Sequence, residues 1–369
     1  MFGRLDGHLV SRSASSRQRS PPQLPVTEPE GTGPMSRTKG LVTYLLISFG
    51  VTWTVEITAR LMGFSLANPL VQILSLGWIA PAAAAFIVRR WVTREGFADA
   101  GLALRMRTAW RHYLAAWLGP LAFTVAAVGV AAALGLWQPT LAPLNDLIPG
   151  LPWWAFLAVL MLVVPLLAPV YWGEEFGWTS YLRLRIFPGR PLAATLATGL
   201  IWAVWHYPLA FLGYIEFGNV ALGLLVWTVS FLCQEIILTW LRLRSGSIWT
   251  TSVAHAGNNM TLSFLTGIVL GGTIDATVNI AIMTAPMVVV AGWILLSGRY
   301  EAQPPTTAER KPETRSVRPG NGVRAEADLR NASPRSDQYL PIVDSTRAGR
   351  LFNEGRDAFA TRHRAPGWR

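Results

Sequence analysis

Long apolar stretches dominate the middle of this chain and restrict what it can fold into. Crossing the hydrocarbon of a membrane takes about 20 apolar residues per helix. The composition agrees, because 51% of the 369 residues are hydrophobic and only 14% are charged, against about 25% in an ordinary soluble domain. We therefore predict an all-α, polytopic membrane protein. Its eight expected transmembrane helices are roughly residues 41–59, 69–88, 113–136, 153–172, 191–212, 220–240, 247–270 and 277–297.

The positions of the basic residues follow the order of these predicted spans. The net charge of +11 could suggest a nucleic-acid partner, but lysine and arginine concentrate in the two tails and in every second loop. In the loops between, Arg60 is the only basic residue. This alternation is the positive-inside pattern of a multi-pass membrane protein. It predicts an even number of spans in the lipid bilayer of a plasma membrane, both termini in the cytoplasm, and no nucleic-acid partner.

Two polar regions flank the expected bundle. Residues 1–38 are rich in Ser, Pro and Arg, and residues 299–369 are rich in Arg, Pro and acidic residues. Neither region has an apolar core, so both are predicted to be disordered tails, the second of them cytoplasmic. The transmembrane bundle is predicted to occupy residues 39–298. Met1 and Met35 are both possible starts, because the second stands just before the first span.

Ionisable side chains interrupt or border three of the apolar stretches. Glu174 and Glu175 are adjacent, His206 lies in the fifth stretch, and His255 precedes Asn259 by about one helical turn. An ionisable group in hydrocarbon costs several kcal/mol, so each marks a candidate functional site. Each also has an ordinary structural explanation, as a helix cap or as a hydrogen bond between helices. Their depths are compatible with one cavity, and together they predict a hydrolytic centre.

These residue types suit hydrolysis. A glutamate can activate water as a general base, and a histidine with an asparagine one turn away offers a base or ligand beside a neutral donor for an oxyanion. A set of Glu, His and His with an open position is also known to bind zinc. Glu174, His206 and His255 could therefore hold a zinc ion, and whether a metal takes part is left open. The H-E-x-x-H motif of zincins is absent, and no organic cofactor is expected.

The surrounding sequence predicts local distortion of two helices. Pro165, Pro169 and Gly173 precede the glutamate pair, so the helix that carries it is expected to be kinked or broken near the pair. Pro208 follows His206 by two residues and should disturb that helix, because proline removes a backbone donor and clashes with the preceding turn.

The three motifs, in this order, resemble the CPBP family of intramembrane proteases, also called the type II CAAX prenyl protease or ABI family. The matching segments are Glu174–Trp178, Trp202–Pro208 and Ser247–Asn259. The resemblance covers about residues 150–265. It implies an all-helical core of eight spans with its active site in the cytoplasmic half.

By this resemblance, Glu174 would activate the water that attacks a peptide bond, and Glu175 would orient the residues around it. His206 would assist Glu174 or hold a metal, while His255 and Asn259 would stabilise the oxyanion. The resemblance therefore predicts an intramembrane endopeptidase, metal-dependent or glutamate-dependent. Its expected substrate is a membrane-associated or prenylated-type protein or peptide.

One position departs from the family pattern. The first motif of the family usually reads Glu-Glu-x-x-x-Arg, and here Thr179 occupies the last position. Threonine cannot neutralise a carboxylate, so Glu175 needs another partner, and Arg183 lies about 12 Å further along a helix axis. An alternative therefore stays open, namely a catalytically inactive membrane scaffold or bacteriocin-immunity-type protein on the same fold. Glu56, expected near the outer interface, and Glu235, expected inside the bundle, are not predicted to be catalytic.

Overall fold

The computed structural model describes residues 34–66, 68, 77–271 and 274–298. All of them belong to the first of two units into which the chain divides, and this unit ends at residue 306. The two tails predicted to be disordered lie outside the described residues, except for residues 34–38. These five residues are helical, so the first helix begins earlier than predicted. The helix can begin outside the hydrocarbon, because the long cationic side chains of Arg37 and Lys39 reach toward water.

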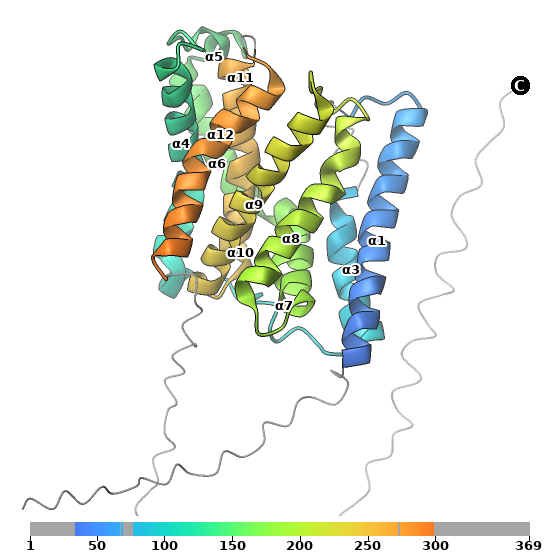
Figure 1. Cartoon of the computed structure of the whole chain (residues 1–369). Coiled ribbons are helices and arrows are strands. Elements are labelled where there is room, and N and C mark those ends of the chain that lie inside the picture. Colours follow the sequence, from blue (N-terminus) through green and yellow to red (C-terminus); the bar gives the residue numbers. More distant parts are fainter. Residues whose placement is uncertain (1–33, 67, 69–76, 272–273, 299–369) are drawn as a thin grey trace, which may run out of the picture. The chain divides into compact units, whose positions relative to one another are not determined.

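Every regular element in the described part of the chain is helical, which confirms the all-α prediction (Figure 1). Three of the elements, η2, η3 and η5, are π-helices, and η1 and η4 are 3-10 helices. In chain order the elements are α1 (Pro34–Leu61), η1 (Gly77–Ile79), α3 (Ala80–Ile87), η2 (Val88–Val92), α4 (Met106–Ala133), α5 (Ala142–Asp146), α6 (Trp153–Gly177), η3 (Trp178–Leu182), α7 (Arg183–Ile186), α8 (Pro191–His206), η4 (Tyr207–Ala210), α9 (Val220–Ser245), α10 (Ile248–Gly257), η5 (Asn258–Leu265), α11 (Thr266–Leu270) and α12 (Ala276–Leu296).

Several of these helices can span a membrane. Among the described residues, five helical stretches are long and apolar enough to do so, and they identify an integral membrane protein. The five are Met35–Leu61, Met106–Ala133, Trp153–Ile186, Val220–Ser245 and Ala276–Leu296. The other three predicted spans fall on shorter or interrupted helices, with residues 69–76 outside the described part. The count of eight spans therefore stays a prediction.

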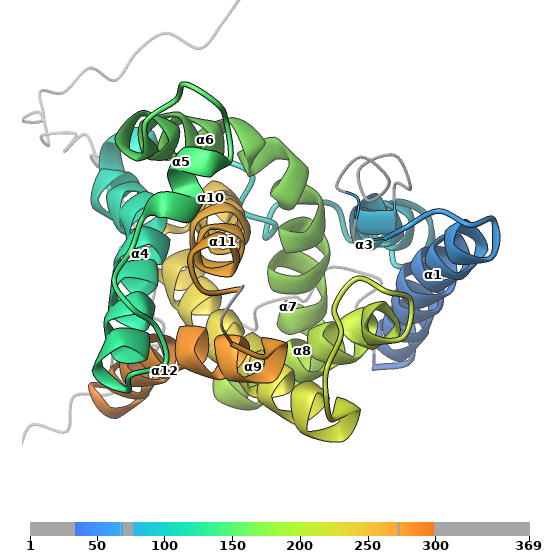
Figure 2. The same ribbon diagram turned by 90° about the horizontal axis from the view of Figure 1, so that it is seen from above.

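Helix α10 lies in the interior of the bundle. It packs against α4, α6 and α9, and Figure 2 shows α10 and α11 enclosed by these helices and α12. Helices α1 and α3 pack on each other on the side of the bundle away from α4 (Figures 1 and 2). The contact of α3 with α6 is close because two glycines of α6 face it: Gly173 lies against Ala82, and Gly177 lies against Pro81. Small side chains let helix backbones approach each other in lipid.

The helix that carries the glutamate pair is not broken; of the predicted kink or break, the break is therefore wrong and the kink stays a prediction. Pro165 and Pro169 lie inside α6, and the helical path continues through η3 and α7 as far as Ile186. Each proline removes one backbone hydrogen bond. Inside a membrane bundle, neighbouring helices and local adjustments can compensate for that loss, so the helix continues.

The helices that carry the histidines change form close to them. Helix α8 ends at His206 and becomes a 3-10 helix at Tyr207, as Pro208 predicts. Helix α10 widens into the π-helix η5 at Asn258, three residues after His255. The π-helix η3 follows α6 in the same way. Such wide turns occur frequently at functional sites.

One residue, Asp99, connects the loop between η2 and α4 (residues 93–105) to three helical segments. The carboxylate of Asp99 accepts hydrogen bonds from Arg89 at 2.7 Å and from Arg185 at 2.8 Å. Arg242 of α9 donates to the backbone carbonyl of Asp99 at 3.0 Å. The loop thereby ties together η2, α7 and α9.

The same loop also holds the two segments that carry the predicted site. The hydroxyl of Ser180 in η3 donates to the carbonyl of Ala100 at 2.8 Å. The backbone N–H of Ile248, at the start of α10, donates to the carbonyl of Gly101 at 2.9 Å. The end of α6 and the beginning of α10 are therefore fixed to one backbone segment.

We predict that Asp99 makes the stability of the fold depend on pH. Burial acts to raise the pKa of Asp99, but the positive charges of Arg185 and Arg89 outweigh it, so this pKa lies below its ordinary value. The ion pairs should therefore stabilise the fold above about pH 4, and the contribution should be lost as the pH falls below that value. Asp99→Asn should lower the melting temperature at neutral pH, and the difference from wild type should shrink in acid.

Thermal unfolding of detergent-solubilised protein between about pH 7 and about pH 3 measures this effect. The Asp99 side chain is half exposed, so we expect a modest change in melting temperature. Asp146→Asn removes an exposed carboxylate from α5 and serves as the control. A difference for Asp99→Asn that does not shrink in acid would contradict the prediction.

Candidate active site

The two adjacent glutamates of α6 contact different helices. Both side chains are buried, with exposures of 7% for Glu174 and 1% for Glu175. An oxygen of Glu174, Oε2, accepts a hydrogen bond at 3.0 Å from Nε1 of Trp202 in α8. Oε1 of Glu175 lies 2.9 Å from Nδ1 of His255 in α10. Successive side chains on a helix point about 100° apart, so two adjacent glutamates can contact two different helices.

Trp202 joins the three sequence motifs. Its indole donates to Glu174, and its ring centroid lies 5.7 Å from that of His206 and 5.1 Å from that of His255. The structure thus brings Glu174, His206 and His255 around one buried tryptophan. In the sequence, Trp202 stands out only through its spacing of four residues from His206. That spacing is the one signal that could have marked it as part of the site.

His206 lies among aromatic rings. Its ring is 4.6 Å from that of Phe231 and 4.7 Å from that of Trp205, centroid to centroid. Nδ1 of His206 lies 3.0 Å from the backbone carbonyl of Trp202. A carbonyl oxygen can only accept, so Nδ1 carries the hydrogen and Nε2 is left to accept a proton or a ligand in the neutral ring.

His255 is held on two sides. Glu175 binds its Nδ1, and the ring of Tyr171 lies 4.7 Å from the imidazole, centroid to centroid. The side chain is buried. Because Nδ1 faces a carboxylate, the orientation of the imidazole is fixed and Nε2 is the nitrogen available for other contacts.

Asn259 lies beside His255, but it contacts the backbone of that residue. Its Nδ2 donates to the carbonyl of His255 at 3.2 Å, and one amide hydrogen remains for another acceptor. The neighbouring Asn258 is buried and donates to Gln234 at 3.3 Å. Both asparagines lie in the π-helix η5. The sequence predicts Asn259 on the same α-helical face as His255, but the helix changes from α to π between the two residues.

The position where the family has arginine contains a fully buried threonine. The hydroxyl of Thr179 donates to the backbone carbonyl of Glu175 at 2.9 Å, so it makes no use of the carboxylate. Glu175 has His255 as its partner. Arg183, the nearest arginine along the chain, is buried and interacts electrostatically with Glu235. A partner for Glu175 is therefore present without the family arginine.

Two other acids lie inside the bundle. Glu235 is buried in α9, as expected for an acid inside the bundle, and accepts a hydrogen bond at 3.0 Å from Thr239 of the same helix. Glu56 was expected near the outer interface. That depth stays a prediction; its side chain is packed into the protein with 9% exposure.

The described residues contain no group of three or more His, Cys, Asp or Glu side chains arranged to hold a metal ion. A zinc site needs its ligand atoms about 2.0–2.3 Å from one centre. Glu174, His206 and His255 surround an indole ring rather than a common point. In this arrangement they do not fit a zinc ion, and we assign no step of the reaction to a metal. That these three residues could hold zinc was a hypothesis from the sequence, and it stays untested.

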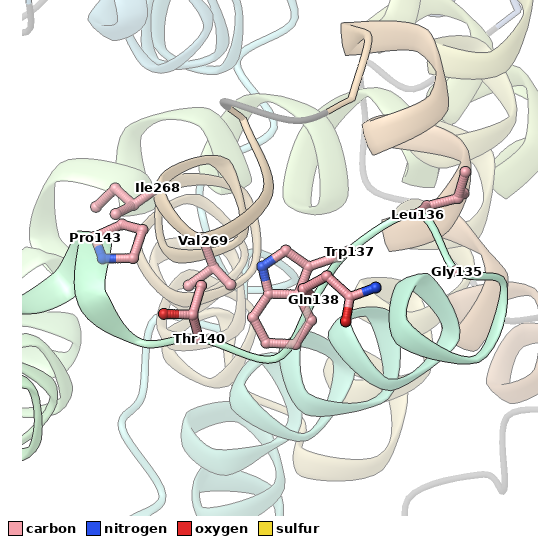
Figure 3. Close-up of a pocket in the computed structure, with 8 residues that line it drawn as sticks. All are labelled: Gly135, Leu136, Trp137, Gln138, Thr140, Pro143, Ile268 and Val269. Atoms are coloured by element: carbon pink, nitrogen blue, oxygen red, sulfur yellow. The ribbon is translucent and has the colours of Figure 1, made fainter.

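Two hollows in the described part of the protein are lined by residues other than the predicted site residues. The one in Figure 3 has a volume of about 430 Å³ and is formed by the loop after α4, including Trp137, and by Val269 of α11. None of the predicted site residues lines it. A second hollow of about 320 Å³ lies between α1, α8 and η4, where Trp53 and Tyr207 contribute to its apolar wall.

Comparison with known proteins identifies the family of this region. Residues 149–261 match the family model described as "Type II CAAX prenyl endopeptidase Rce1-like". This segment contains all three motifs, and the match confirms the family recognised from them. No curated protein matches the chain. At the level of the family, the match supports a CAAX-type intramembrane protease, which has a protein substrate.

We predict that the bond between Glu175 and His255 contributes measurably to stability. Glu175→Leu removes the acceptor and leaves Nδ1 of His255 buried without a partner, which should cost about 1–3 kcal/mol of unfolding free energy. Glu175→Gln keeps an acceptor oxygen and should lose less. Equilibrium unfolding in mixed micelles measures both changes. Equal losses in the two variants would show that the hydrogen bond is not what holds α6 to α10.

Proposed function

We propose that this chain is an intramembrane endopeptidase of the CAAX type that uses a water molecule activated by Glu174. One observation carries the proposal: the buried carboxylate of Glu174, the buried His255 and the half-buried His206, from three separate motifs, surround Trp202 in an apolar bundle. Ionisable groups in such surroundings are costly. Their convergence is more readily explained by chemistry than by helix packing alone.

In the proposed reaction, Glu174 is the general base. It takes a proton from water while the water oxygen attacks the carbonyl carbon of the scissile peptide bond. The tetrahedral intermediate then collapses, the C–N bond breaks, and the proton held by Glu174 passes to the leaving amine. The hydrogen bond from Trp202 fixes one carboxylate oxygen and leaves the other for water.

The histidines and Asn259 support this step. Glu175 orients His255 and stabilises a positive charge on its ring, so that Nε2–H can donate to the developing oxyanion. The second amide hydrogen of Asn259 is a further donor for the same oxygen. His206 offers Nε2 as an acceptor on the side of Trp202 and assists Glu174 in positioning water.

The substrate we propose is a membrane-associated protein or peptide, and a prenylated-type C-terminus is the form that the family description suggests. The site is enclosed by helices with long apolar surfaces. A substrate that is itself anchored in the bilayer reaches such a site without first leaving the lipid.

The alternative function, an inactive scaffold or immunity-type protein on the same fold, rests on Thr179. An unpaired carboxylate at Glu175 would favour it, because a buried charge without a partner is destabilising. Glu175 has His255 as its partner, and this removes the main reason to prefer the inactive form. We therefore favour the enzyme.

Glu174→Gln should abolish proteolysis. Gln cannot take a proton from water, and loss of a general base lowers the rate by about 10²–10⁴-fold. The assay is cleavage of a prenylated C-terminal peptide and of an unmodified membrane-anchored peptide by wild-type protein in proteoliposomes. Glu235→Gln, which removes another buried carboxylate of the bundle, is the matched control and should retain activity. Undiminished cleavage by Glu174→Gln would rule out the proposed base.

The same assay tests for a metal. We expect cleavage to survive a chelator, because the described side chains do not form a metal-holding group. The control is the wild-type enzyme treated with chelator and then supplied with zinc. Loss of activity with chelator and its recovery with zinc would place a metal in the reaction.

The proposed topology has both termini in the cytoplasm of a plasma-membrane protein. A reporter fused after Arg299 should behave as cytoplasmic, because the arginine-rich loops alternate with nearly uncharged ones. A reporter fused in the loop after Arg60 should lie on the opposite side. The same side for both fusions would overturn the alternation.

A further inference from the structure

One face of α1 carries buried hydroxyl groups for which the proposed reaction has no use. Tyr44, Ser48 and Thr52 follow one another at intervals of four residues, so their side chains share one face of the helix. All three are fully buried, whereas Leu46 between them is 70% exposed. The polar face of α1 is therefore turned toward the protein.

Two of these hydroxyls lack the partner that a buried hydroxyl ordinarily has. Oη of Tyr44 and Oγ of Ser48 make no hydrogen bond to any of the described residues. A serine or threonine inside a helix can bond the carbonyl one turn earlier, as Thr124, Thr261 and Thr284 do in this protein. Ser48 makes no such bond, so its hydroxyl is available to a ligand.

A third polar atom of this kind belongs to Trp178, the first residue of η3. Its side chain is fully buried, and its Nε1 makes no hydrogen bond within the described part of the chain. The indole meets the ring of Tyr44 edge-on, with 5.8 Å between the centroids. A buried donor without an acceptor is destabilising, so its presence here calls for an explanation.

These groups lie beside the proposed base. Trp178 follows Glu174 by four residues, and its backbone N–H donates to the carbonyls of Glu174 and Glu175, so the side chains of Trp178 and Glu174 share one face. The phenol of Tyr44 lies directly on the last turn of α6. A Cβ atom on Gly177 would come within 2.6 Å of its hydroxyl oxygen, and the glycine leaves room for that hydroxyl.

Helix α1 is fixed in this orientation by two further hydrogen bonds. Nε1 of Trp205 donates to the carbonyl of Ser48 at 3.2 Å, and Nε1 of Trp53 donates to the carbonyl of Trp205 at 3.0 Å. Trp205 precedes His206, and its ring lies 5.6 Å from that of Trp178, centroid to centroid. The polar face of α1 is thereby held against the segment that carries the site.

Two pairs of these groups interact without a direct hydrogen bond. The phenol of Tyr44 interacts with Ser48, and the indole of Trp178 interacts with the carboxylate of Glu174, yet neither pair is directly bonded. Polar groups in this relation are often joined by a water molecule. An apolar interior holds water only where about two to four polar groups bind it, and these side chains supply them.

We propose that Tyr44, Ser48 and Trp178 form a water-binding site between α1 and the end of α6 that supplies the hydrolytic water to Glu174. The proposal rests on Glu174 being the base of the proposed function. A water that accepts a hydrogen bond from Nε1 of Trp178 and donates one to Glu174 keeps a lone pair for the carbonyl carbon of the scissile bond. Its proton passes to Glu174, and its oxygen remains in the new carboxyl group. The hydroxyls of Tyr44 and Ser48 hold the water that replaces it.

The first experiment detects the water and needs no activity. X-ray radiolysis of the protein in proteoliposomes, in water labelled with a heavy oxygen isotope, turns bound water into hydroxyl radicals that label adjacent side chains. Tyr44 and Trp178 should take up the isotope although both are fully buried, whereas Met287, a buried and readily oxidised residue of α12, should not. Labelling of Tyr44 and Trp178 that does not exceed that of Met287 would overturn the proposal.

A pair of substitutions at Ser48 sharpens the same measurement. Ser48→Val replaces the hydroxyl by two methyl groups and should remove the label from Tyr44, because it takes both a polar partner and the space of the water. Ser48→Ala removes the hydroxyl without adding volume and should keep part of the label. Full labelling of Tyr44 in Ser48→Val would show that Ser48 is not part of the site.

The second experiment uses proteolysis. Trp178→Phe removes the donor and should lower kcat about tenfold, the effect of one hydrogen bond, with KM unchanged because the substrate is not contacted. Trp240→Phe is the matched control, since Nε1 of Trp240 is also buried without a partner among the described residues, and it should retain wild-type kcat. Unchanged kcat in Trp178→Phe would overturn the role of the site in the reaction. If wild type cleaves nothing, the proposed function fails, whereas radiolysis still decides whether the site binds water.

Discussion

The hydrogen bond between Glu175 and His255 is the interaction on which the arrangement of the site depends. It joins α6 to α10, the helix in the interior of the bundle, through two side chains that are almost completely buried. If α10 turned or slid relative to α6, an acid and an imidazole would be left unpaired in an apolar interior, at a cost comparable with much of a domain's net stability. This one contact therefore fixes the rotation of both helices.

Tryptophan indoles provide several further polar contacts between helices near the site. Trp202 donates to Glu174, while Trp53 and Trp205 lock α1 and α8 to each other. An indole has a large apolar body and one N–H donor. It can fill the space between helices and still satisfy an acceptor, which suits a site that must be both dry and polar.

At the end of the bundle where α10 begins, arginine and aspartate side chains make the polar contacts between elements. The loop of residues 93–105 gathers η2, η3, α7, α9 and α10 through Asp99 and neighbouring backbone carbonyls. Arg89 is fully buried there, and its guanidinium also donates to the carbonyl of Ser180. Buried charged groups are tolerated at this end because their ion-pair and hydrogen-bond partners are held in place. The loop holds together the helix ends from which the glutamate pair and His255 project.

The sequence by itself determined that the chain is an all-helical membrane protein and which polar residues stand out in it, because apolar length and isolated charges can be read residue by residue. It also fixed the end of α8, since Pro208 acts locally. Tertiary structure decided the rest. Pro165 and Pro169 did not break α6, because packing compensates for a lost backbone bond. Glu175 pairs with His255; this pairing depends on how helices distant in sequence are rotated against one another, which no local pattern encodes.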